Sequence, residues 1–345
     1  MTPRPRARRI GIMLWPSPGR NAGFERALWC EDQGFDDVWF PDGEGMQDAL
    51  TLAAGVATRT AQVRLCTGIV PVYNRPPAIL ATSALALSHL APGRFVLGIG
   101  SSTHAMVENW YGRRFEKPLA HVRETTELLR RLFAGEKTDF RGEALCSRGF
   151  RLKEMPAASV PIHIAAMGPK MLDLAGEIGD GVVLNDMTPD DRIPEALERI
   201  DRGAKRSGRR VEDLEISIRR AVIVSRDEGP ARELFRSQFT FYASTPVYQR
   251  QMVLLGYREQ IDEIRTGYAT RDRRRSLAAV DDAMLERFYV FGDGDACRAR
   301  IRASYEAGID SVFVSPQAGD AAGFESTCEA FAPAVFSAAG SRRST

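Results

Sequence analysis

The chain has 345 residues, 44% of them hydrophobic and 27% charged, a composition typical of globular proteins rather than disordered or fibrous ones. Its 47 lysines and arginines nearly balance 45 acidic residues, and the formal charge of +2 gives no indication of nucleic-acid binding. No run of about 18 apolar residues occurs, so we expect no membrane span. The basic N-terminus leads directly into a predicted strand without an apolar signal core, which predicts a cytoplasmic protein.

Histidine and cysteine, the residues of most metal sites and many nucleophilic sites, are scarce, with four and five copies respectively. The cysteines are scattered, without zinc-site or redox spacing, and this favours a reducing compartment. No motif of a zinc protease, a serine hydrolase or a P-loop is present. We therefore predict no metal site, and we expect an organic cofactor to carry the chemistry if the chain is an enzyme.

The first hundred residues alternate apolar runs with amphipathic segments. Strands are predicted over 9–15, 36–40, 63–70 and 94–100, and helices over 23–33, 48–60 and 77–90. The strand starts lie roughly 27 to 30 residues apart, the length of one βα unit. Near-continuous apolar strands between helices indicate a parallel sheet covered on both faces.

This alternation breaks once and then resumes. A polar segment over 101–118 precedes a predicted helix over 119–134 and a hairpin over 138–152, with Gly142 near its turn. Further strands are predicted over 161–167, 181–185, 214–224 and 311–314, with helices over 170–178, 191–207 and 295–307.

Eight strands alternating with helices predict a (β/α)8 barrel, formed as a single domain over 1–345. A doubly wound open sheet is the alternative. Residues 228–290 are aromatic, charged and helical without a clear strand, so we expect them to form a lid-like insertion.

In a barrel, ligands bind at the C-terminal ends of the strands. This rule selects Trp15, 42–44, 68–71, 100–104, 166–168, 185–186 and 315–317. The selected residues are rich in glycine and small polar side chains. Such residues let a flat ring approach the backbone and offer amides for hydrogen bonds.

Three of these strand ends each have two interpretations. Gly100, Ser101 and Ser102 end a strand but do not complete a GxGxxG motif, so they predict either a phosphate or sugar contact or an ordinary tight turn. Gly168 opens a helix whose dipole and free amides form an anion site, or it opens an ordinary helix. Lys170 in that first turn opposes the dipole unless an anion is near. Gly68 indicates a bulge or a peptide pressed against a ring.

Few side chains near the predicted site are able to transfer a proton. His104 lies just beyond the fourth strand and is either a proton donor and acceptor or a solvated loop histidine. Glu44 and Glu108 are acidic loop residues and are further candidates for proton transfer. The arginine-rich run 271–275 could meet an acidic ligand, although a solvated loop is the better interpretation.

Several segments, in their order and spacing, resemble the luciferase-like superfamily, and specifically its branch of coenzyme F-420-dependent oxidoreductases. The resemblance extends over about residues 8–335, and the segments that carry it are 34–39, 94–100, 124–131, 161–169 and 175–181. It implies a (β/α)8 barrel with a lid near the last strands. It also implies a deazaflavin, or FMN in other branches, over the strand ends, and a homodimer.

The resemblance also implies roles for particular residues. The Gly68–Ile69 bond matches the family's non-prolyl cis peptide, which bulges against the ring. The matching cofactor contacts are Asp42, Gly68, Ile69, Gly100, Ser101, Ser102, Met167, Gly168, Lys170 and Met171.

Two positions depart from the family's dehydrogenases. Gly43 replaces the catalytic histidine after the second strand, and Thr103 replaces the glutamate after the fourth. Sugar-phosphate or alcohol oxidation is therefore disfavoured. Our leading hypothesis is an F-420-dependent reductase of a small organic substrate with a C=C, C=N or pterin-type acceptor. The alternatives are an FMN-dependent monooxygenase and a non-catalytic flavin-binding protein.

Overall fold

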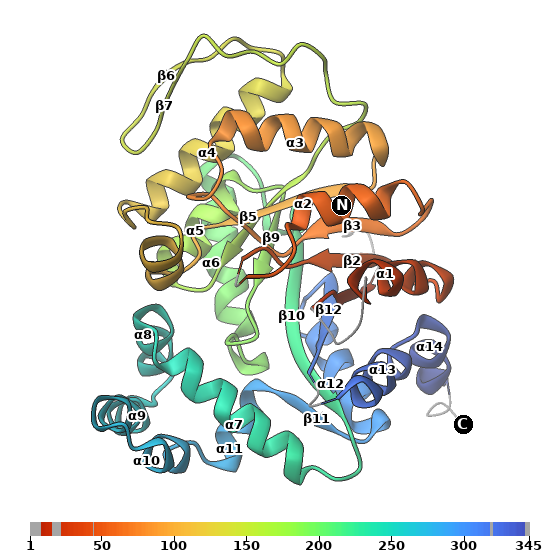
Figure 1. The fold of residues 1–345 in the computed structure, drawn as a ribbon, viewed down its shortest axis with the longest axis vertical. Helices are drawn as coiled ribbons and strands as arrows, with labels where there is room; N and C mark the ends of the chain where they lie inside the picture. Colours follow the sequence, from red (N-terminus) through yellow and green to blue (C-terminus); the bar gives the residue numbers. More distant parts are fainter. Residues whose placement is uncertain (1–7, 16–21, 44, 318–319, 342–345) are drawn as a thin grey trace.

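A closed barrel of eight parallel strands forms the centre of the molecule (Figure 1). The computed structural model describes residues 8–15, 22–43, 45–317 and 320–341. The barrel strands are β1 (Arg9–Met13), β2 (Asp37–Phe40), β3 (Arg64–Thr67), β5 (Phe95–Gly100), β8 (Ile162–Ala166), β9 (Gly181–Leu184), β10 (Glu215–Val224) and β12 (Ser311–Pro316). The barrel closes because β10 pairs with both β9 and β12. The predicted (β/α)8 barrel is confirmed, and the alternative of an open sheet is wrong.

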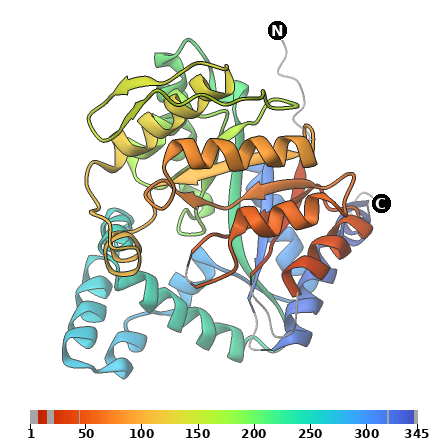
Figure 2. The ribbon, with the colours of Figure 1, turned by 45° about the horizontal axis from the view of Figure 1, so that its top comes forward.

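Helices surround the barrel close to where the sequence predicted them (Figure 2). They are α1 (Ala22–Asp32), α2 (Ala49–Ala57), α3 (Pro77–Leu90), α4 (Pro118–Phe133), α5 (Pro169–Ile178), α6 (Ile193–Arg206) and α12 (Gly294–Glu306). Local sequence signals explain where helices begin. Asp48, for example, accepts a hydrogen bond from Thr51 N and thereby caps the N-terminus of α2. Two C-terminal helices, α13 (Ala321–Ala330) and α14 (Pro333–Ser341), are present although the sequence analysis does not predict them.

The middle of the barrel is filled by side chains and is not a pore. The layer consists of Met13, Trp39, Cys66, Val96, Val183 and Phe313. Trp39 and Phe313 stack with their ring centroids 4.1 Å apart. This packed layer separates the two ends of the barrel, so the chemistry of each end can be considered by itself.

The N-terminal end of the barrel contains a buried charge network. The guanidinium of Arg64 donates to both carboxylate oxygens of Asp37, at 2.7 and 2.9 Å, and to both of Glu215, at 2.7 and 2.6 Å. Asp37 is fully buried and also accepts a hydrogen bond from Ser311. The network links β2, β3 and β10 across the barrel, and we interpret it as structural.

The predicted strand over 63–70 is interrupted in the structure. β3 ends at Thr67, and a separate β4 (Val70–Pro71) pairs with β5. The polar segment 101–118 contains a π-helix at Met106–Trp110, which its sequence did not indicate. The predicted hairpin is present as β6 (Asp139–Arg141) and β7 (Cys146–Arg148).

The predicted insertion is helical, as expected. It consists of α7 (Gly229–Ala243), α8 (Pro246–Leu254), α9 (Arg258–Thr270), α10 (Arg273–Ala278) and α11 (Asp282–Phe288). These helices form a group at one end of β10 (Figure 1) and enclose an aromatic core that includes Phe235, Phe239 and Phe288. A short strand that was not predicted, β11 (Val290–Gly292), pairs with the end of β10 and ties the insertion to the barrel.

Among the helices of the described ranges, none has the length and apolar character needed to cross a membrane.

The charge network predicts that the free energy of unfolding falls at acidic pH. Burial alone would raise the pKa of Glu215, but hydrogen bonds from Arg64 and nearby positive charge lower it from 4.5 to about 2. A lowered folded-state pKa stabilises the fold above the unfolded pKa, and this stabilisation is lost as pH falls towards the folded pKa. We expect Glu215→Gln to remove up to about 3 kcal/mol of this pH-dependent stability.

Urea unfolding between about pH 6 and pH 3 measures this effect. Glu212→Gln is the matched control, because its side chain is 48% exposed and lies 4.0 Å from its arginine partner. Parallel stability curves for Glu215→Gln and the wild type would contradict the assignment.

Candidate functional site

The C-terminal edge of the barrel contains a non-prolyl cis peptide between Gly68 and Ile69. It lies at the interruption between β3 and β4, where the family resemblance predicted it, and the prediction of a cis bond is confirmed. The side chain of Ile69 folds back towards β5. This peptide forms one side of the barrel mouth.

Close contacts between β3 and β5 shape this side of the mouth. Thr67 Oγ1 donates to the Gly98 carbonyl and accepts from the Gly98 amide, both at 2.8 Å. A Cβ on Gly98 would lie 2.0 Å from the Thr67 carbonyl oxygen, and one on Gly100 would lie 3.1 Å from Ile69 Cδ1. The two glycines are therefore required for packing, and Gly100 makes room for Ile69.

Asp42, at the end of β2, is buried in an ion pair with Arg75. Its Oδ2 lies 2.5 Å from Arg75 Nη1, and its Oδ1 accepts from the amide of Ala49 at 3.3 Å. Arg75 also pairs with Asp48. Sequence analysis missed Arg75, because a single arginine in the loop before α3 has no recognisable motif.

Gly43 is the residue that the family resemblance matches to the histidine of the dehydrogenases. Its φ is +117°, and a Cβ there would lie 2.7 Å from Met106 Cε and 3.1 Å from the Tyr111 hydroxyl. Residues around the π-helix thus fill the space of the missing side chain. Glu44, the next candidate, lies outside the described residues.

The loop after β5 brings His104 and Glu108 together. His104 Nε2 lies 3.2 Å from Glu108 Oε2, and the side chains are 58% and 38% exposed. Glu108 also accepts from the amide of Phe115. Thr103 Oγ1 accepts from the amide of Met106, so the residue that replaces the family's glutamate holds the start of this helical turn.

The two serines after β5 form local contacts. Ser101 Oγ donates to the Ser102 carbonyl at 3.4 Å. Ser102 has a positive φ of 59°, and its hydroxyl lies 3.2 Å from Met106 Sδ. Neither hydroxyl is committed to a strong internal hydrogen bond, so both remain available to a ligand.

The start of α5 is open to solvent. Gly168 is its N-cap without a side-chain cap, and a Cβ on Gly168 would meet no atom within 4 Å. Lys170 is exposed in the first turn, and Met171 donates its amide to the Gly168 carbonyl. Met167 packs against the core of the insertion. The first turn of α5 therefore has no side-chain cap and has an exposed lysine beside it.

A polar cluster lies where the segment after β9 meets β10 and α7. Arg219 Nη2 donates to Asp186 Oδ1 and to the hydroxyl of Tyr242 on α7, both at 2.8 Å. Burial alone would lower the pKa of Arg219, but the Asp186 carboxylate raises it. Arg219 lies 5.8 Å from the ring centroid of Trp15, whose Nε1 donates to Ser315 Oγ.

Asp186, Trp15 and Ser315 were selected as strand-end residues, whereas Arg219 and Tyr242 were missed. A signal for Arg219 existed: two adjacent arginines stand in the middle of the mostly apolar β10.

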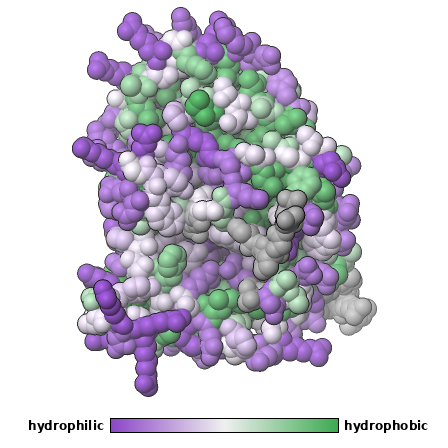
Figure 3. All heavy atoms as spheres, viewed as in Figure 1, coloured by the Kyte–Doolittle hydropathy of each residue, from purple (hydrophilic) through white to green (hydrophobic). Residues whose placement is uncertain are grey.

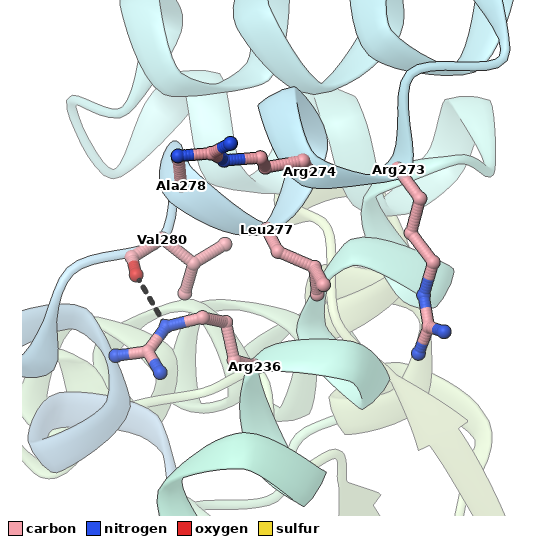
Figure 4. A pocket seen from close by; sticks show the side chains of 6 residues that line it. All are labelled: Arg236, Arg273, Arg274, Leu277, Ala278 and Val280. Atoms are coloured by element: carbon pink, nitrogen blue, oxygen red, sulfur yellow. Dashed lines mark hydrogen bonds between the residues drawn. The ribbon is translucent and has the colours of Figure 1, made fainter.

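A hollow of about 580 Å³ lies on the insertion, away from the strand ends (Figure 4). It is lined by Arg236, Arg273, Arg274, Leu277, Ala278 and Val280. Arg236 donates to the Val280 carbonyl, and Arg273 points away from the other two arginines. Hydrophilic side chains also project over α9 and α10 (Figure 3). The arginines diverge, so they do not form a convergent anion site.

Sequence and structure comparisons agree with this architecture. Residues 16–311 match the luciferase-like monooxygenase family. The chain is 31% identical over 317 residues to 5,10-methylenetetrahydromethanopterin reductase of Methanolobus tindarius, covering 90% of this chain and 94% of that protein. It is 32% identical over 254 residues to the F-420-dependent glucose-6-phosphate dehydrogenase of Kineococcus radiotolerans, covering 69% and 73%.

Among solved structures, the coenzyme F-420-dependent tetrahydromethanopterin reductase of Methanopyrus kandleri superposes with a TM-score of 0.80 at 24% identity, covering 96% of this chain and 99% of that chain. That reductase shares the (β/α)8 barrel of this chain over nearly its whole length. The chain belongs to the luciferase-like monooxygenase family.

The packing around Gly43 predicts how the stability of the fold responds to a side chain at this position. We expect Gly43→Ala to destabilise the fold by about 3 kcal/mol, because the added methyl is strained at this φ and meets Met106 and Tyr111. Gly45→Ala is the control, since Gly45 also has a positive φ but open space around it. We expect the control to cost about 1 kcal/mol in urea unfolding. Equal losses would show that Met106 and Tyr111 do not restrict this position.

Proposed function

We propose that this protein is a coenzyme F-420-dependent reductase, which transfers a hydride from the reduced deazaflavin to a C=C, C=N or pterin-type acceptor. The observation that carries the proposal is the similarity of nearly the whole chain to a pterin reductase, together with the similarity to an F-420-dependent dehydrogenase. Both relatives exceed 30% identity to this chain.

The residues at the barrel mouth fit such a cofactor. Gly68, Ile69 and Gly100 offer a flat, side-chain-poor wall for a ring, and the uncapped start of α5 suits a phosphate in the cofactor tail. Asp42, Ser101 and Ser102 lie at neighbouring strand ends, where they would hold polar parts of the same molecule. When bound, the reduced deazaflavin supplies the hydride.

Two missing groups favour reduction over alcohol or sugar oxidation. An alcohol dehydrogenase needs a base for the hydroxyl proton, and Gly43 and Thr103 stand where the family's acid and base groups occur. A reductase needs only a proton donor. The exposed His104–Glu108 pair, with its 3.2 Å contact, can hold a proton near the loop after β5.

Cofactor choice gives the direct test. Apo-protein is titrated separately with F-420 and with FMN, and binding is followed by quenching of protein fluorescence. We expect F-420 to bind more tightly. Tight FMN binding without F-420 binding would overturn the proposal in favour of an FMN-dependent monooxygenase.

The anion site at α5 gives a second test. We expect Lys170→Glu to weaken F-420 binding about tenfold, because a carboxylate in the first turn repels the phosphate of the tail. Lys153→Glu changes the net charge equally at an exposed position after the β6–β7 hairpin and serves as the control. If the two variants bind F-420 equally well, the phosphate lies elsewhere.

A further inference from the structure

The order of strands places β10 directly across the barrel from β3. Four steps separate the two strands in either direction around the ring, through β5, β8 and β9 or through β2, β1 and β12. A flat ring seated against Gly68 and Ile69 therefore turns its other face towards β10. Arg219 lies on that strand, one residue beyond the level where β9 ends at Leu184.

The guanidinium of Arg219 has N–H groups that make no hydrogen bond within the described part of the chain. Nη2 makes both bonds, to Asp186 and Tyr242, while Nε is buried without a partner and Nη1 has none among the described residues. The side chain is 13% exposed, so the head group is largely shielded from water. Asp186 Oδ2 and the Tyr289 hydroxyl nearby are also buried without partners. Buried polar atoms without partners also occur elsewhere in the chain, but these three belong to residues that interact electrostatically with one another. Together they form a cluster of donors and acceptors that a ligand is able to satisfy.

The charge of Arg219 is already balanced. The Asp186 carboxylate lies 2.8 Å away with a side chain only 1% exposed, so the pair is neutral as a unit. Because the pair is neutral as a unit, it would bind an oxygen through its free N–H groups, which donate to a polarised or negative oxygen, and not through net charge. Trp15, beside the guanidinium, provides a flat apolar surface. A planar, neutral carbonyl compound fits this combination.

We propose that Arg219 binds the carbonyl oxygen of the acceptor, and that the substrates are therefore compounds whose C=C or C=N bond is conjugated to that carbonyl. The inference rests on the proposed function. In a C=C–C=O or C=N–C=O unit, the hydride supplied by the reduced deazaflavin would add to the carbon farthest from the carbonyl, and the displaced electron pair would move to the carbonyl oxygen. A proton from water then completes the reduced bond. Arg219 stabilises the oxygen where negative charge develops, and the deazaflavin is oxidised by two electrons.

Two probes test the substrate class with the F-420-loaded enzyme. Cyclohex-2-enone carries the conjugated carbonyl, and 1-pyrroline has a C=N bond without any oxygen. Arg219→Met leaves Asp186 unpaired, so the double variant Arg219→Met/Asp186→Asn, which keeps the site neutral, is measured beside it. We expect the double variant to lose about 100-fold in kcat/KM with the enone. With 1-pyrroline, which lacks the oxygen, we expect the wild type and the double variant to be equally slow within about threefold, and both at least about 100-fold below the wild type with the enone.

A binding measurement without cofactor separates this inference from the proposed function. The oxygen of 4-nitrophenolate resembles the enolate oxygen, and its absorbance reports binding to the apo-protein. We expect the double variant to bind it at least about tenfold more weakly than the wild type. If F-420 fails to bind but this difference remains, the proposed function is wrong and the oxygen site stands. Equal losses with both acceptors, no turnover of the enone by the F-420-bound wild type, or no difference in phenolate binding would overturn the inference.

Discussion

The contact between Thr67 and Gly98 is the constraint on which the proposed site depends. The Thr67 side chain holds both backbone groups of Gly98, and only glycine fits beneath the Thr67 carbonyl. β3 is thereby fixed against β5 at the point where it breaks, and Ile69 is directed over Gly100. A larger residue at Gly98 would separate the strands and move the wall against which a ring is expected to lie.

Charge is distributed very differently at the two ends of the barrel. The N-terminal end holds Arg64 between two carboxylates, and every nitrogen and oxygen of these three side-chain groups has a hydrogen-bond partner. At the C-terminal end of the barrel, the pair of Arg219 and Asp186 retains hydrogen-bond donors and acceptors without partners. A saturated network rigidifies a structure, whereas an unsaturated one is able to bind a ligand without first breaking internal bonds. The packed layer containing Trp39 and Phe313 keeps these two environments apart.

Much of the architecture could be predicted because its signals are local. Short segments are enough to indicate an apolar strand, a helix start such as Pro77 or the spacing of βα units. The family resemblance located the cis bond between Gly68 and Ile69. The separate strand β4, the π-helix and β11 escaped prediction. Each depends on contacts with distant residues, such as the fit of Ile69 over Gly100, which leave no pattern in the segment itself.

The sequence by itself determined the barrel, the helical insertion, the family and the set of strand ends at which a ligand is expected. Only the tertiary structure decided which side chains meet there. It paired Asp42 with Arg75, filled the space at Gly43 with Met106 and Tyr111, and brought Arg219 to Asp186 and to Tyr242 of the insertion. The physical reason is that periodicity reports local conformation and burial, while hydrogen bonds and ion pairs depend on distances that closure of the barrel sets.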